Sequence, residues 1–109
     1  MLDTYAVIAE PSRRRILDRL LQSDSSVSEL ARDLGLSQPL ISKHLRTLRE
    51  SGLVQVRVEA QRRIYSLNAA PLAEIDEWLS AYRMRWNQHV DALAEHLEQR
   101  KRLREGTSK

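Results

Sequence analysis

Hydrogen-bonding side chains follow one another closely in the stretch SQPLISKHLRTLRESGL, residues 37–53. Amide, hydroxyl, guanidinium and ammonium groups match the donors and acceptors that base edges and phosphates present in a DNA groove. Glutamine can bond bidentately to adenine, and arginine or lysine can bond to guanine or phosphate. We therefore predict contacts with double-stranded DNA from Gln38, Ser42, Lys43, His44 and Arg46.

One helix beginning at residue 38 would present these side chains together. Ser37 can cap that helix, Pro39 fits its first turn, and Gly52 can end it. His44 borders the apolar stripe of the helix, so its pattern leaves open whether it packs inside or contacts DNA. The stripe itself consists of Leu40, Ile41, Leu45 and Leu48.

A second helix is predicted immediately before this one. Ser26 and Glu29 form an S-x-x-E capping box, and Gly35 suits the position after the last helical turn. Only residues 35–37 separate the two helices. Two helices joined by such a short glycine-containing turn form a helix-turn-helix, whose second helix can lie in the major groove.

A strand pattern follows in VQVRVEAQRRIYSL, residues 54–67, where apolar and polar residues alternate. It predicts a β-hairpin, which makes the helix-turn-helix the winged variety. Arg57, Arg62 and Arg63 near its far end are expected to reach the DNA backbone or a narrow minor groove. The tip, EAQR, has no glycine, so we expect a longer loop there in place of a tight type I′ turn.

Helices are also predicted at both ends of the chain. Residues 2–9 have a helical apolar rhythm, and Pro11 opens a further helix through about Gln22. Pro71 precedes a long final helix with apolar residues spaced by threes and fours. The predicted fold is mainly α with one small hairpin, in the order α-α-α-α-β-β-α, and the end helices need partners to cover their apolar faces.

Composition narrows the functional classes. A chain of 109 residues fits one domain, which we expect over 1–98, followed by a basic, flexible tail over 99–109. The absence of cysteine excludes disulfides and thiolate metal sites. Neither a signal peptide nor a membrane span is apparent, so we expect a cytoplasmic protein with no membrane partner. No phosphate loop or catalytic set can be identified, so we expect neither enzymatic activity nor a cofactor.

The stretches PSRRRILDRLL and VSELARDLGLSQPLISKHLRTLRESGLVQVRVEAQRRIYSL, with the long closing helix, resemble the ArsR/SmtB family of bacterial winged-helix repressors. The resemblance spans about residues 5–97. It implies a homodimer that blocks transcription at a pseudo-palindromic operator, commonly in its own promoter. It also implies that the first and last helices form the dimer interface, here through Leu2, Tyr5, Leu79, Tyr82, Trp86, Val90, Leu93 and Leu97.

The sequence departs from the metal-sensing members of this family. Where they carry an E-L-C-x-C-D type motif, this chain has ELARD at 29–33, so that sensor cannot exist here. On the last helix His89, Asp91, His96 and Glu98 have other spacings than the family's second metal site. His89 and His96 lie about 10.5 Å apart along one helix, too far to share an ion within one subunit. We predict no metal site, and a metal-responsive repressor using these side chains is the alternative.

The segment DEWLSAYRMRWNQHVDALAEHLE resembles a cysteine-free subgroup of the family, whose members often have no established inducer. The sequence therefore leaves any small-molecule inducer open. A further alternative is a winged helix that binds only protein. Cations on both the second helix and the hairpin argue against it, because such a domain has little need of them.

Overall fold

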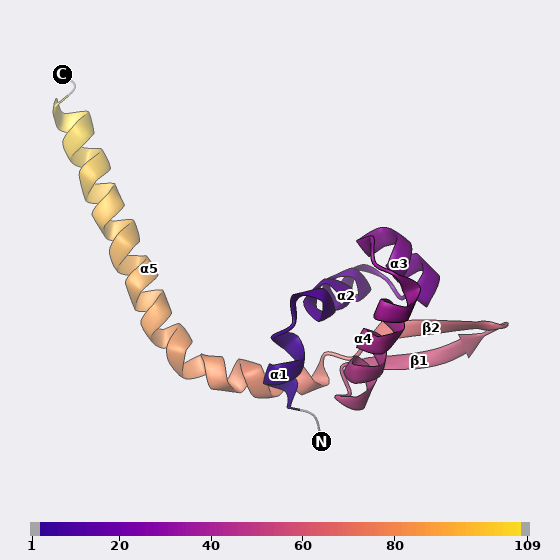
Figure 1. The fold of residues 1–109 in the computed structure, drawn as a ribbon. Helices are drawn as coiled ribbons and strands as arrows, with labels where there is room; N and C mark the ends of the chain where they lie inside the picture. Colours follow the sequence, from indigo (N-terminus) through magenta and orange to yellow (C-terminus); the bar gives the residue numbers. More distant parts are fainter. Residues whose placement is uncertain (1–2, 108–109) are drawn as a thin grey trace. The chain divides into compact units, whose positions relative to one another are not determined.

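The computed structural model describes residues 3–107, with side chains as far as Arg104 (Figure 1). The chain divides into two compact units, Met1–Ile75 and Asp76–Lys109. The predicted order of elements is confirmed, with one short 3-10 turn added at Ala70–Leu72. The elements are α1 (Thr4–Ile8), α2 (Pro11–Gln22), α3 (Val27–Leu34), α4 (Gln38–Glu50), β1 (Val54–Glu59), β2 (Arg62–Leu67) and α5 (Ala73–Thr107).

Local capping signals set the ends of α3 and α4. The Ser26 hydroxyl accepts a hydrogen bond from the Glu29 backbone amide at 3.3 Å, which confirms the capping box. Gly35 ends α3 in the left-handed conformation with φ of 67°. The Ser37 hydroxyl then accepts from the Leu40 amide at 3.3 Å and starts α4. The helix-turn-helix follows from these short-range contacts.

The core of the first unit holds α4 with one face inward. Ile41, Leu45 and Leu48 are fully buried, together with side chains of α2, α3 and the hairpin base. Leu40, in contrast, is 36% exposed, so its predicted place in the buried stripe was wrong. Successive helical residues are rotated by about 100°, which places Leu40 at the edge of the arc centred on the other three.

The hairpin closes more tightly than predicted. Val54 pairs with Leu67, and the ladder continues to the pair of Glu59 and Arg62. Only residues 60 and 61 connect the strands, so the expected longer loop was wrong. Ala60 adopts the left-handed conformation with φ of 55°, which a glycine would adopt at lower cost. A non-glycine residue thus closes the tight turn at some conformational cost.

We expect Ala60→Gly to raise the free energy of unfolding by about 1 kcal/mol, because glycine removes the clash of Cβ in a left-handed residue. Urea unfolding followed by circular dichroism measures this change. Gln61→Gly is the matched control. Gln61 has no positive φ, so glycine there should only add freedom to the unfolded chain and lower stability. Equal effects of the two substitutions would contradict the strain at Ala60.

Helix α5 runs without interruption from Ala73 to Thr107. It continues through residues 99–107, which were predicted to form part of a flexible tail. Glutamate, glutamine, lysine, arginine and leucine dominate this part, and all of them favour helices. No helix in the described part of the chain is both long and apolar enough to cross a membrane.

Candidate nucleic-acid interface

The exposed side of α4 carries four of the predicted DNA contacts, which we call the α4 face: Gln38, Ser42, Lys43 and Arg46. All four side chains are exposed. Ser42, Lys43 and Arg46 lie on the side of the helix away from Ile41, Leu45 and Leu48, whereas Gln38 is exposed because it is the first residue of the helix. The Arg46 side chain is 84% exposed and lies 3.3 Å from the Glu50 carboxylate on the same helix. Exposed pairs of this kind hold a side chain only weakly, so Arg46 remains able to turn to another acceptor.

His44 does not belong to the α4 face. It is 8% exposed, and its Nε2 lies 3.7 Å from the Glu10 carboxylate at the start of α2. Its Nδ1 is buried and finds no hydrogen-bond partner among the described residues. The sequence left open whether His44 packs inside or contacts DNA, and its burial favours packing. The reason is rotational, since His44 lies next to the arc of Ile41, Leu45 and Leu48, about 40° around the helix from Leu48.

Glu10 joins α4 to the start of α2 while also capping α2. Its carboxylate accepts a hydrogen bond from the Arg13 backbone amide at 3.0 Å. Loss of hydration acts to raise the pKa of Glu10, but the backbone amides of Arg13 and Ser12 outweigh it and hold that pKa below its usual value. The carboxylate therefore stays charged beside His44 at neutral pH.

The three hairpin arginines differ in their surroundings. The Arg57 guanidinium donates to the Asp24 carboxylate at 2.6 Å and to the Glu59 carboxylate at 3.2 Å. The Arg62 guanidinium donates to the Glu29 carboxylate and to the Ser26 hydroxyl. Arg63 is exposed and makes no ion pair with any residue that the structure describes. Two of the three predicted DNA contacts are thus occupied by carboxylates of the same chain.

These pairs also shift the titration of their members. The hydrogen bond to Asp24 raises the pKa of Arg57. The Ser26 hydroxyl and the Arg62 guanidinium hold the pKa of Glu29 below its usual value. Arg57 and Glu29 therefore stay charged at neutral pH. Asp24 and Glu29 were not predicted as arginine partners, because each lies 33 residues from its arginine and no local pattern links them.

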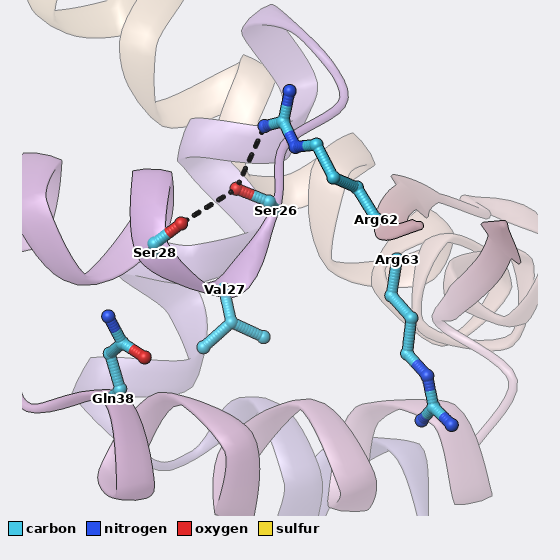
Figure 2. Close-up of a pocket in the computed structure, with 6 residues that line it drawn as sticks. All are labelled: Ser26, Val27, Ser28, Gln38, Arg62 and Arg63. Atoms are coloured by element: carbon cyan, nitrogen blue, oxygen red, sulfur yellow. Dashed lines mark hydrogen bonds between the residues drawn. The ribbon is translucent and has the colours of Figure 1, made fainter. Parts of the chain in front are cut away.

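A hollow of about 220 Å³ lies between the hairpin and the beginnings of α3 and α4 (Figure 2). Arg62 turns toward Ser26, whereas Arg63 points in the opposite direction. Hydroxyl, amide and guanidinium groups around such a hollow can donate to an anion such as a phosphate. Its lining residues are Ser26, Val27, Ser28, Gln38, Arg62 and Arg63.

The predicted dimer residues of α5 are open to solvent in the single chain. We call them the α5 seam: Leu79, Tyr82, Trp86, Val90, Leu93 and Leu97. Leu79 is half-buried, and the other five are between 50% and 66% exposed. The rings of Trp78 and Tyr82 contact each other in a tilted arrangement, with centroids 5.0 Å apart and an angle of 49° between the ring planes.

The two predicted dimer residues of the N-terminal region differ from the α5 seam. Tyr5 is half-buried, and its hydroxyl donates to the Glu74 carbonyl at 3.2 Å within the first unit. Leu2, also predicted at the interface, lies outside the described residues.

The histidine and carboxylate side chains of α5 do not gather into a metal site. Within the part of the chain that the structure describes, no group of three histidine or carboxylate residues is close enough to hold an ion. His89, Asp91, His96 and Glu98 all lie along one exposed helix. A shared ion would require ligands from a second subunit.

Known proteins share this arrangement. Residues 10–56 match the family model described as bacterial regulatory protein, arsR family. The chain is 39% identical over 71 residues to the HTH-type transcriptional regulator Rv2034 of Mycobacterium tuberculosis, covering 65% of this chain and 66% of that protein. It is 32% identical over 79 residues to the transcriptional repressor SdpR of Bacillus subtilis, covering 72% of this chain and 88% of SdpR.

A solved structure extends the similarity to the whole fold. A crystal structure named as a possible transcriptional regulator for arsenical resistance has a TM-score of 0.68 and 34% sequence identity. The match covers 88% of this chain and 97% of that one. The winged helix-turn-helix architecture is thus shared with solved transcriptional regulators.

Proposed function

The chain belongs to the arsR family of bacterial regulatory proteins and is a DNA-binding transcriptional regulator, and we propose that it represses transcription as a homodimer on a pseudo-palindromic operator. One observation supports a DNA-binding role for the residues of the α4 face. The α4 face is exposed on a helix whose opposite side is fully buried, so the helix is held rigidly with its hydrogen-bonding groups outward.

The α4 face supplies the contacts to bases and nearby phosphates in this proposal. Gln38 is suited to adenine, and Arg46 is suited to guanine, because each offers two hydrogen-bonding atoms in one plane. Ser42 and Lys43 would hold phosphates or further base edges. The hollow beside Arg63 gives room for a backbone phosphate next to the start of α4. These contacts together would fix the register of α4 in the major groove.

The α5 seam supports the homodimer. Between residues 3 and 104, eight of the eleven exposed large hydrophobic side chains lie on α5. Extended apolar surface of this kind usually marks an interaction site. A two-fold symmetric partner would cover it with the same surface, and would present two copies of α4 to half-sites about one DNA turn or a multiple of it apart. An operator with two-fold symmetry follows from such a dimer.

Repression is the direction of control that we propose, and SdpR, a relative by sequence, is named a repressor. A dimer lying across a promoter blocks it without any chemistry, so we propose no catalytic activity. We place the protein in the cytoplasm, where a bacterial regulator meets DNA. We propose that its own promoter is among its targets.

A genome-wide binding profile of the tagged protein in its native cell tests the proposal. We expect enrichment at a small number of sites that include its own promoter and share an inverted repeat. Transcripts from those sites should rise when the gene is deleted. Absence of enriched sites would overturn DNA binding, and transcripts that fall on deletion would overturn repression.

A further inference from the structure

The segment from Asp24 to Glu29 comprises the end of the connection between α2 and α3 and the first three residues of α3, and it touches the hairpin at several points along its length. The Asp24 carboxylate accepts from Arg57 on β1 at 2.6 Å. The backbone of Ser25 pairs with Tyr65 on β2 through two hydrogen bonds of 3.1 and 2.8 Å. Ser26 and Glu29 accept from Arg62. This segment, which we call the 24–29 segment, therefore contacts both strands.

The base and the outer part of the hairpin are held differently. At the base, Ile64 and Tyr65 are buried, and Asn68 closes the hairpin by donating to Gly52 and Leu53 carbonyls, each at 2.8 Å. The outer part, residues 57–63, is exposed, and Val58 there is 70% exposed. Apolar burial therefore does not anchor the outer hairpin, and polar side chains must orient it.

The strand register determines which arginines can orient the outer hairpin against the 24–29 segment. Arg57 lies opposite Ile64, and residues two apart on a strand share a face. Arg62 therefore lies on the same face as Arg57, toward the 24–29 segment. Arg63 pairs with Val58 and occupies the other face. Figure 2 shows the same divergence, with Arg62 directed at Ser26 and Arg63 away from it.

We propose that Arg57 and Arg62 are positioning residues that hold the outer hairpin against the 24–29 segment, and that Arg63 is the hairpin cation that contacts DNA. The assignment of Arg63 rests on the proposed function. We call the bonds of Arg57 to Asp24 and of Arg62 to Ser26 and Glu29 the two ties, and they exist without DNA. At Arg57 and Arg62 a phosphate would compete for the guanidinium with a carboxylate of the chain itself, Asp24 or Glu29. Arg63 has no such competitor among the described residues, so its charge is available to a phosphate.

The tie can be tested without DNA by measuring {1H}-15N heteronuclear NOEs of the amides of residues 58–63. Arg57→Ala, Asp24→Ala and Arg62→Ala should each lower these NOEs, because the outer hairpin loses an attachment and gains motion on the picosecond to nanosecond timescale. Arg63→Ala is the matched control and should leave them unchanged. Wild-type NOEs in all three tie variants would overturn the positioning role.

The DNA arm uses a duplex of the operator recovered from the binding profile, with affinity measured at several salt concentrations. Arg63→Ala should lower the slope of log affinity against log salt by about one unit. Arg57→Ala and Asp24→Ala should each weaken binding by a similar factor, roughly two- to fivefold, with the slope unchanged. The variant that combines Arg57→Ala with Asp24→Ala should bind the operator as tightly as Arg57→Ala alone, because the two substitutions remove the same tie.

The same affinity measurements can also overturn the proposal. If Arg57→Ala lowers the slope by about one unit while Asp24→Ala binds as tightly as wild type, Arg57 contacts phosphate and the proposal fails. It fails likewise if Arg62→Ala lowers the slope by about one unit. If the wild-type protein binds no duplex, the proposed function fails. The NOE measurements then still decide the tie by themselves.

Discussion

Leu93→Asp is expected to convert the protein to a monomer and to weaken operator binding by about 10²- to 10⁴-fold. A charge within the α5 seam would have to be buried without a partner in the dimer. Once the dimer is lost, each α4 binds its half-site alone, and the gain from linking two binding events disappears. The fold of the first unit should persist, because its buried core contains no residue of the seam.

Sedimentation velocity and fluorescence anisotropy with labelled operator measure the two effects. Gln88→Asp is the matched control, since it introduces the same charge on an exposed residue of α5 about 140° around the helix from Leu93. We expect that variant to remain dimeric and to bind normally. A monomeric Leu93→Asp protein with wild-type operator affinity would refute the dimer as the DNA-binding form.

The second large effect is expected at the α4 face. Arg46→Ala should reduce operator-binding free energy by about 1–3 kcal/mol, with a smaller loss on unrelated DNA, if Arg46 bonds to a base. Adding Lys43→Ala should weaken binding to all sequences and lower the salt slope by about one unit. Both side chains are exposed, so the free energy of unfolding should change by less than about 0.5 kcal/mol.

Titrations of operator and scrambled duplex at several salt concentrations separate these contributions. Arg85→Ala removes one exposed positive charge from α5 and leaves α4 intact, so it controls for net charge. It should change operator affinity little. Operator binding that survives both Arg46→Ala and Lys43→Ala at wild-type strength would remove the α4 face from the interface.

The helix-turn-helix could be predicted from sequence because its signals act over short distances. The capping bond of Ser26 spans three residues, and the Gly35 stop depends on one residue's backbone angle. The apolar repeat of α4 placed Ile41, Leu45 and Leu48 inside correctly. The hairpin strands followed from their alternation, and their register was then determined by a two-residue turn.

Two predictions were wrong because they relied on the local sequence and not on each residue's neighbours in the folded chain. The absence of glycine at the hairpin tip suggested a longer loop, yet the pairing of the strands stabilises Ala60 in a left-handed conformation. Leu40 was placed by its spacing in the apolar stripe with Ile41, Leu45 and Leu48, although the rotation of α4 leaves it at the exposed edge. Propensity and periodicity do not reveal how far around a helix the neighbouring elements reach.

The sequence by itself determined the order of elements, the caps of α3 and α4, and the apolar seam of α5, because these depend on residues a few positions apart. Tertiary structure decided which polar groups are available. It buried His44 beside Glu10, and it paired Arg57 and Arg62 with carboxylates 33 residues away in sequence. Arginines with identical propensities thus acquired different surroundings, because an ion pair depends on distance in space and the chain brings distant residues together only by folding.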